Sequence, residues 1–250
     1  MIELPILLLQ GDAEARLLAD AEASLQAVLP HREVKLTTAW VPRADWLDPV
    51  APPPPEPLRR RGLIPDVDAR ELLEQPHRLV LFSLLPSVAI PALRHRSGGA
   101  FLVHQGLRAR WSPEDREAVM AECTEEPPLS AREATAALEP VIARLQERGA
   151  VVAVCSAFRH VKEPLDPKRR EGPPSLRELV RHTNLEAARL SQRTGCFVFD
   201  VDRPLAEEGG APLGTDCFGG TGRAAEIAMD ELVALLLDTL PDDATAPGEP

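Results

Sequence analysis

The sequence contains no tyrosine, few aromatic residues (4%) and only three lysines among its 250 residues. Basic charge is in short supply too: 28 Lys and Arg stand against 39 Asp and Glu, for a formal net charge of −11. A nucleic acid or an anionic membrane surface would need a basic face on the protein, so this balance argues against both as partners. We therefore expect a small-molecule ligand or a partner protein, with no nucleic acid and no membrane.

Long hydrophobic runs and paired metal ligands are also missing. The apolar run at residues 6–9 is too short to span a membrane or to act as a signal peptide, and serines and prolines interrupt residues 79–93. The six histidines lack the spacing of a helical metal pair, and the cysteines form no Cys-x-x-Cys motif; they are Cys123, Cys155, Cys196 and Cys217. We expect no metal, no cofactor and no disulfide framework, and a cytoplasmic protein with reduced thiols.

Proline is abundant, with 26 residues, and it clusters. Seven prolines fall within residues 42–57, including an unbroken run at 52–55. This composition predicts an extended, polyproline-like surface loop rather than a helix or strand. We find no internal repeat and expect one domain over residues 1–240, followed by a flexible C-terminal tail at 241–250.

Short apolar runs alternate with helical patterns along the chain. The runs are typical of strands buried in a parallel sheet, and they lie at residues 6–9, 33–40, 79–83, 150–154 and 196–201. Helical spacing of apolar residues predicts helices at 15–29, 68–74, 130–148, 176–193 and 221–240, and another helix starts at Ser112. A further strand or hairpin is expected at 100–103. Strands and helices in this order indicate an α/β fold with a doubly wound parallel sheet, whose ligands bind in loops at the carboxyl ends of the strands.

Two of those loops carry family-like motifs. Residues 7–13, Leu-Leu-Leu-Gln-Gly-Asp-Ala, place Gly-Asp after an apolar strand, and residues 213–219 place Asp216 shortly before the last helix. With these motifs the chain resembles the SGNH (GDSL-type) hydrolases over residues 4–240. The resemblance implies a five-stranded flavodoxin-like sheet in a three-layer α/β/α sandwich.

The chain departs from the family pattern where that pattern supplies the chemistry. Ala13 stands at the position of the nucleophilic serine, and Gly219 stands where the family keeps its basic histidine, three residues after Asp216. Neither side chain can attack an ester or accept a proton. Leu84 and Pro86 occupy the region that normally contributes to the oxyanion hole. The resemblance therefore implies a degenerate member of the family, a pseudoenzyme that binds a partner protein or a small acyl, sugar or peptide ligand.

A second hypothesis stays open: an active hydrolase or acyltransferase with a relocated nucleophile. Cys217 or Ser156 would attack with His160 as the base, and Asp216 lies beside Cys217. For the binding hypothesis, backbone N–H groups at the last helix entry could hold an anion, and the loop after the third strand is apolar. The expected ligand-binding residues are Gly11, Asp12, Ala13, Leu84, Leu85, Gly219, Gly220 and Arg223.

Overall fold

The computed structural model describes residues 2–47, 56–60, 69–97, 100–103, 108–157, 176–207 and 222–239. Its main sheet is parallel and five-stranded, in the order β2-β1-β3-β7-β8. The strands are β1 (Ile2–Gln10), β2 (Arg32–Trp40), β3 (Leu79–Ser83), β7 (Val151–Cys155) and β8 (Phe197–Phe199). This order confirms the predicted α/β fold with a doubly wound parallel sheet.

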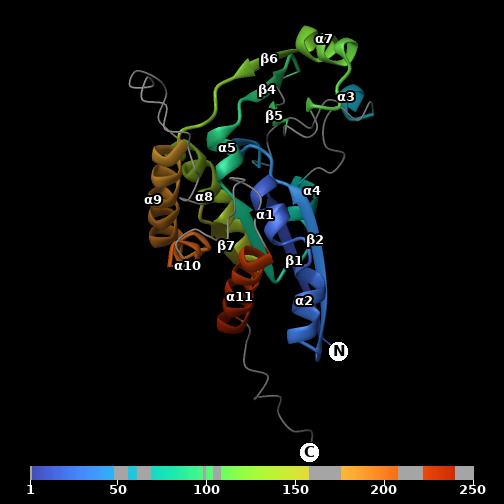
Figure 1. Cartoon of the computed structure of the whole chain (residues 1–250). Helices are drawn as coiled ribbons and strands as arrows, with labels where there is room; N and C mark the ends of the chain where they lie inside the picture. The colour runs from blue at the N-terminus through green and yellow to red at the C-terminus, as the bar shows by residue number, and fades with distance from the viewer. Residues whose placement is uncertain are drawn as a thin grey trace, which may run out of the picture.

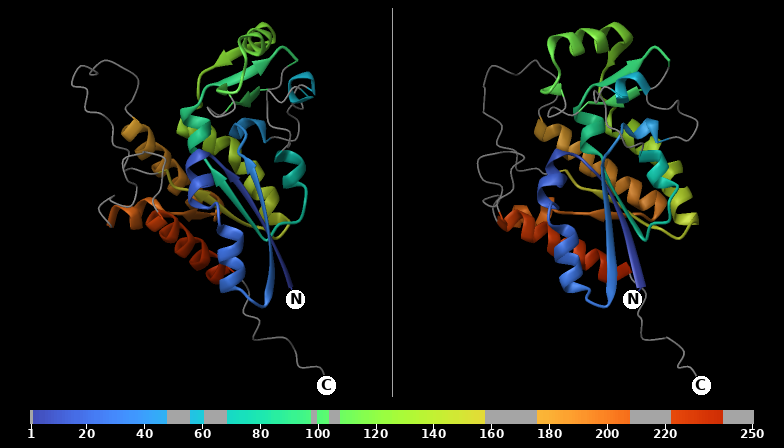
Figure 2. Two further views of the ribbon diagram at one scale, coloured as in Figure 1. Left: turned by 45° about the vertical axis from the view of Figure 1, so that its right-hand side comes forward. Right: turned by 90° about the vertical axis from the view of Figure 1, so that its right-hand side faces the viewer.

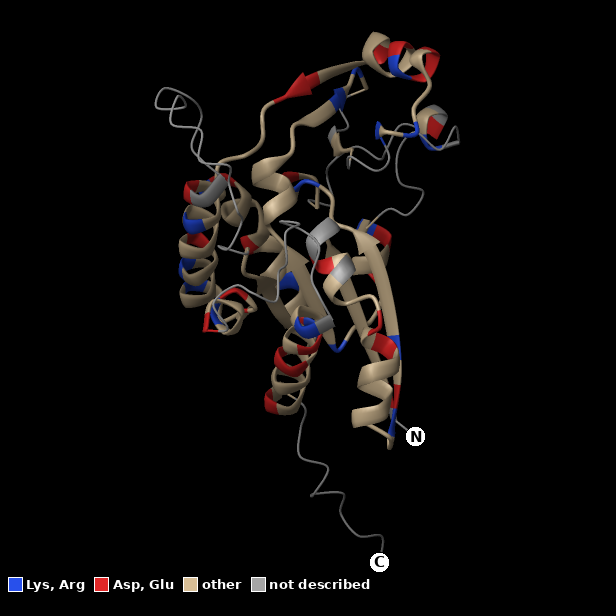
Figure 3. Ribbon diagram, viewed as in Figure 1, with Lys and Arg blue, Asp and Glu red and all other residues tan. Residues whose placement is uncertain are grey.

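The central strands are apolar because both of their faces are buried. In β1, Leu4, Ile6 and Leu8 point into one core, whereas Leu7 and Leu9 point into the other. The same two-residue alternation divides β3 and β7 between the two cores. Neither β3 nor β7 contains a charged residue, and both ribbons are uniformly tan in Figure 3.

Helices cover both faces of the sheet and complete a three-layer sandwich (Figures 1 and 2). One core is closed by the four helices α1 (Asp12–Leu17), α2 (Ala21–Val28), α10 (Asp202–Glu207) and α11 (Gly222–Thr239). The other is closed by α4 (Ala69–Leu73), α5 (Leu85–Ala89), α8 (Ala131–Glu147) and α9 (Leu176–Thr194). No helix in the described ranges is both long and apolar enough to cross a membrane.

A second, antiparallel sheet lies beyond the carboxyl end of the main sheet, at the top of Figure 1. Its strands run in the order β5-β4-β6 and comprise β4 (Ala92–His95), β5 (Ala100–Leu102) and β6 (Cys123–Glu126). Together with α7 (Pro113–Glu122) and α3 (Glu56–Arg60), it encloses a small separate core that includes Trp46, Phe101 and Trp111. The sequence predicted β5 but neither β4 nor β6, since β6 has two exposed polar residues and no apolar alternation.

The structure corrects one helix prediction and one loop prediction. The helix predicted at 15–29 is two helices, because the chain turns at residues 18–20 between α1 and α2 and both helices bury leucines in one core. In the proline-rich stretch 42–57, residues Ala44–Trp46 form a short 3-10 helix, η1, and Glu56 begins α3. The expectation of a helix-free surface loop is wrong at these positions, because Ala44 and Trp46 are buried. Residues 48–55 and the predicted tail lie outside the described residues.

Helix ends follow the signals in the sequence. Ser112 caps α7 by accepting a hydrogen bond from the Asp115 N–H at 3.0 Å, and Ser130 caps α8 in the same way through the Glu133 N–H at 3.2 Å. Gly149 ends the α8 region with a positive φ of 83°, a conformation that glycine adopts without a Cβ clash.

Candidate functional site

The carboxyl end of β1 leads directly into α1. Gly11 is the N-terminal capping residue of this helix, and Asp12 and Ala13 form its first turn. These three predicted ligand-binding residues therefore sit together at the edge of the sheet where the sequence placed them. In this architecture the edge is where ligands bind, because the loops of neighbouring strands converge there.

A buried carboxylate closes this edge, and the sequence analysis missed it. Glu14 is 4% exposed, and its Oε2 accepts a hydrogen bond from the Gly11 N–H at 3.1 Å. Its Oε1 accepts a second hydrogen bond from the Ser83 Oγ, at 2.7 Å, at the end of β3. The space lined by Glu14, Cys155 and Ser156 is too small for a water molecule. Glu14 therefore ties the ends of the two central strands together.

The sequence did contain a signal for Glu14. It follows Gly11 by three residues, which is the spacing of a carboxylate that caps the first turn of a helix from inside. Its position between Ala13 and the apolar residues of α1 also places it on the helix segment that packs on the sheet. What the sequence could not show is the contact with Ser83, which lies 69 residues away along the chain.

The loop after β3 folds over the same edge as helix α5. Pro86 lies at the start of α5, and its Cγ would be 2.7 Å from a Cβ added to Gly11. Leu84 is 2% exposed and packs in the core beneath α8 and α9, with the half-buried Leu85 against the same core. These two leucines were predicted from the sequence to bind a ligand. In the structure they serve largely to pack α5 onto the sheet.

We expect Gly11→Ala to destabilise the protein by about 1–3 kcal/mol, because the added methyl overpacks against Pro86. The φ of Gly11 is −92°, so an alanine meets no backbone strain there, and the cost reports the contacts of the new methyl with Pro86 and with Glu14 Oε2, which would lie 3.1 Å away. Urea unfolding of G11A and of the double variant G11A/P86A measures it, and we expect the second substitution to recover part of the loss. A G11A protein as stable as the wild type would show that α5 does not press on this edge.

At the end of β7, the side chains have structural partners. Burial raises the pKa of the Cys155 thiol well above its usual value, and the Glu14 carboxylate raises it further, so Cys155 stays a thiol. Ser156 is 4% exposed, and its Oγ accepts a hydrogen bond from the Asp202 N–H at 3.2 Å. Ser156 therefore holds the start of α10. Its proposed partners His160, Asp216 and Cys217 lie outside the described residues.

The last helix entry is described only in part. Gly219 and Gly220 lie outside the described residues, and Arg223 is the second residue of α11. The Arg223 side chain is 52% exposed, and its Nη1 lies 3.2 Å from Oε2 of Glu226, one turn along the same helix. This pairing turns the guanidinium along its own helix.

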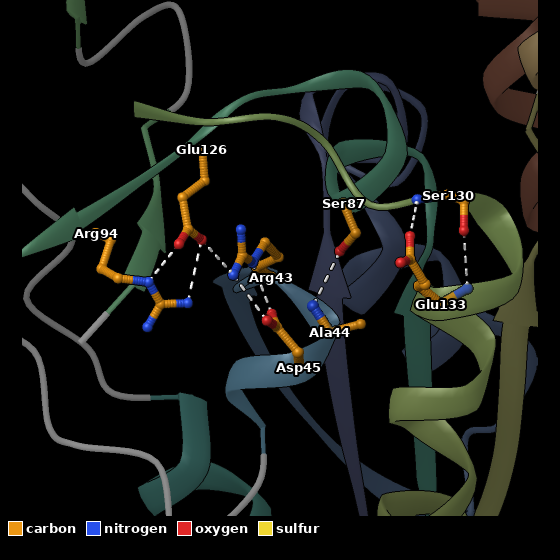
Figure 4. Close-up of polar contacts among 8 residues, drawn as sticks. All are labelled: Arg43, Ala44, Asp45, Ser87, Arg94, Glu126, Ser130 and Glu133. Carbon is orange, nitrogen blue, oxygen red and sulfur yellow. Dashed lines mark hydrogen bonds and ion pairs between the residues drawn. The ribbon is translucent and has the colours of Figure 1, made fainter. Parts of the chain in front are cut away.

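A network of charged residues joins the small sheet to η1, the short helix in the segment that follows β2 (Figure 4). The Arg43 side chain is 3% exposed, with its Nε 2.7 Å from Oδ1 of Asp45 and its Nη2 2.8 Å from Oε2 of Glu126 on β6. Arg94 on β4 also pairs with Glu126, and its Nη2 lies 3.1 Å from Oε2. Beside this network, the Ala44 N–H donates to Ser87 Oγ at 3.0 Å, which links η1 to α5.

The network shifts the pKa values of the residues that form it. Burial by itself lowers the pKa of Arg43, but the hydrogen bonds and charges of Asp45 and Glu126 outweigh it, and the net shift is upward. The hydrogen bond from Arg94, with the further contribution of Arg43, lowers the pKa of Glu126 below its usual value. Arg43 and Glu126 therefore stay ionised near neutral pH, and the small sheet is held over the site edge by charge as well as by its apolar core.

Neither a protein-family model nor the sequence of a characterised protein matches this chain. Among solved structures, Axe2, an acetylxylan esterase from Geobacillus stearothermophilus, is similar over 93% of each chain, at 11% identity and a TM-score of 0.51. A mutant of that esterase gives a TM-score of 0.52 with the same identity and coverage. A candidate SGNH hydrolase from Slackia heliotrinireducens is 13% identical over 93% of this chain and 97% of that one, with a TM-score of 0.47. At these identities the comparison shows one thing: this chain has the fold of the Axe2 esterase, a five-stranded parallel sheet between two layers of helices.

Proposed function

We propose that this protein is a divergent SGNH-hydrolase-like protein that does not hydrolyse esters at the carboxyl edge of its main sheet. The observation that carries the proposal is the Glu14 carboxylate, which takes up the Gly11 N–H and the Ser83 hydroxyl at that edge. With Ala13 in place of a serine, the edge offers a buried carboxyl group where a hydrolase needs a nucleophile.

Electrostatics support the same conclusion. Ester hydrolysis builds negative charge on the carbonyl oxygen, and enzymes stabilise it with free N–H groups or side-chain amides. At this edge the Gly11 N–H is already bonded to a carboxylate, and Pro86 has no N–H to donate. The retained fold is therefore better suited to binding than to acyl transfer.

For the binding role, we propose a partner protein or a small acyl, sugar or peptide ligand at the carboxyl edge. Support comes from the position of the small sheet, which stands over this edge in Figures 1 and 2 and is fixed there by Arg43. We place the protein in the cytoplasm, since three of its cysteines are buried free thiols: Cys123, Cys155 and Cys196.

The test is a steady-state esterase assay with short p-nitrophenyl esters. We expect no turnover above buffer for the wild type, because Ala13 supplies no nucleophile. The double variant A13S/G219H, which restores both family residues, should stay within about tenfold of buffer, because Glu14, Leu84 and Pro86 leave the oxyanion unsupported.

Two outcomes would contradict the proposal. Substantial turnover by the double variant would show that a working oxyanion site persists at this edge. Wild-type turnover that is lost in C217A or S156A, and in H160A, would establish the alternative of a hydrolase with a relocated nucleophile.

A further inference from the structure

A serine, a histidine and a glutamate form a hydrogen-bonded row in the small sheet, away from the edge discussed above. The Ser97 Oγ lies 2.7 Å from Nδ1 of His95, and Nε2 of His95 lies 2.9 Å from Oε2 of Glu122. Two chain segments bring these residues together, since β4 ends at His95 and α7 ends at Glu122. The Arg96 N–H donates to the Glu122 carbonyl at 3.0 Å and fixes the two segments against each other.

The contacts fit a neutral imidazole with its proton on Nε2, donated to the Glu122 carboxylate. The single lone pair of Nδ1 then faces both the Ser97 backbone N–H, at 3.2 Å, and the Ser97 hydroxyl, at 2.7 Å. In this tautomer the Ser97 hydroxyl donates to Nδ1, and the row runs hydroxyl, imidazole, carboxylate. This is the order of groups that activates a serine in hydrolases, with the two ring nitrogens exchanged.

Burial favours a reactive serine in this row. His95 is 8% exposed and is held from both sides, whereas Ser97 lies in the exposed turn after β4. The neighbouring Cys123 is not the nucleophile, because burial and the Glu122 charge raise the pKa of its thiol to about 11. The accessible nucleophile beside the base is therefore the Ser97 hydroxyl.

We propose that Ser97 is a nucleophilic serine that accepts an acyl group from an activated ester or thioester, with His95 as its base and Glu122 orienting the imidazole. The Ser97 Oγ bonds to the acyl carbon as the bond from that carbon to the leaving group breaks. The hydroxyl proton passes to Nδ1 of His95 and from there to the leaving group or to solvent. The products are a Ser97 ester and the free alcohol or thiol.

This activity is separate from the carboxyl edge and does not depend on the function proposed there. The Ser97 N–H is directed to His95 rather than to a forming oxyanion. We therefore expect acylation to be slow and to stop at one acyl group per chain, which distinguishes it from steady turnover.

The experiment uses the full chain and p-nitrophenyl acetate, read by intact mass and peptide mapping. We expect one acetyl group, located on Ser97. Ser112 is the internal control, because its hydroxyl donates to the Asp115 carboxylate at 2.9 Å rather than to an imidazole. Labelling spread over Ser112 and other surface residues at the same rate would overturn the proposal.

Three variants separate activation from structure. S97A should lose the label, H95Q should lower the labelling rate at Ser97 by about a hundredfold, and E122Q should lower it by about tenfold. A merely structural role would leave the labelling rate at Ser97 unchanged in H95Q, and that result would also overturn the proposal. Thermal melts of each variant confirm that the fold persists.

Discussion

Replacing Glu14 by alanine is expected to cost about 3 kcal/mol of unfolding free energy, the largest effect among the substitutions considered. Removing the carboxylate leaves two buried donors, the Gly11 N–H and the Ser83 hydroxyl, without acceptors. Each unsatisfied buried donor costs about 1–3 kcal/mol, and the loss is offset in part because a desolvated charge is removed. E14Q should fall between the wild type and E14A, since the amide oxygen still accepts one hydrogen bond.

Urea unfolding followed by circular dichroism measures this difference. The matched control is E22A, because Glu22 is an exposed glutamate in the first turn of α2, and its loss should stay within about 0.5 kcal/mol. If E14A equals or exceeds the wild type in stability, the contacts of Glu14 do not hold the strands together. A carboxylate retained at a cost to stability would instead mark the edge as a site kept for binding.

Replacing Arg43 by alanine is expected to cost about 2–3 kcal/mol and to loosen the small sheet. Arg43 is a nearly fully buried cation that bridges Asp45 and Glu126. The expected loss is below the ~3–5 kcal/mol of a fully buried pair, because both carboxylates keep some contact with water. Urea unfolding measures the whole loss in unfolding free energy. Limited proteolysis within residues 92–126 shows whether the small sheet unfolds before the rest of the protein.

The matched control is K35A. Lys35 and Glu3 form a 2.6 Å ion pair in which both side chains are at least half exposed, so its loss should cost less than about 1 kcal/mol. If R43A and K35A lose equally little unfolding free energy and are equally resistant to protease, the small sheet is held by its apolar core rather than by charge.

The stability that the ion pairs of Glu126 contribute also depends on pH. Because the folded-state pKa of Glu126 is lowered, its contribution is complete above the ordinary glutamate range and is lost as pH falls through the lowered value. The difference in stability between the wild type and R43A should therefore shrink in acid.

Much of the architecture could be predicted from local sequence signals. The apolar runs at 79–83 and 150–154 predicted the two central strands nearly to the residue, because a strand buried on both faces must be apolar throughout. Ser112 and Ser130 located two helix starts, because capping depends on residues within one turn.

The predictions that failed depend on distant contacts. Strand β6 has a polar sequence and is a strand because it pairs with β4, about thirty residues earlier. The chain after β3 is helical although Leu84-Leu85-Pro86 indicated a loop, and there Leu84 and Val88 are buried in the core beside α8 and α9.

By itself, the sequence determined the order of the five parallel strands and of the long helices, and the place of Ala13 just after the first strand, because each follows from residue type or local spacing. Only the tertiary structure decided what surrounds Ala13 at the carboxyl edge of the main sheet. There the Glu14 carboxylate lies between Gly11 and Ser83, and the small sheet is fixed by Arg43. The row from Ser97 to Glu122 is likewise a tertiary feature, joined across 25 residues by the pairing of β4 with β6. A buried charge is stable only beside donors that the fold brings to it, and those donors are not adjacent in the chain.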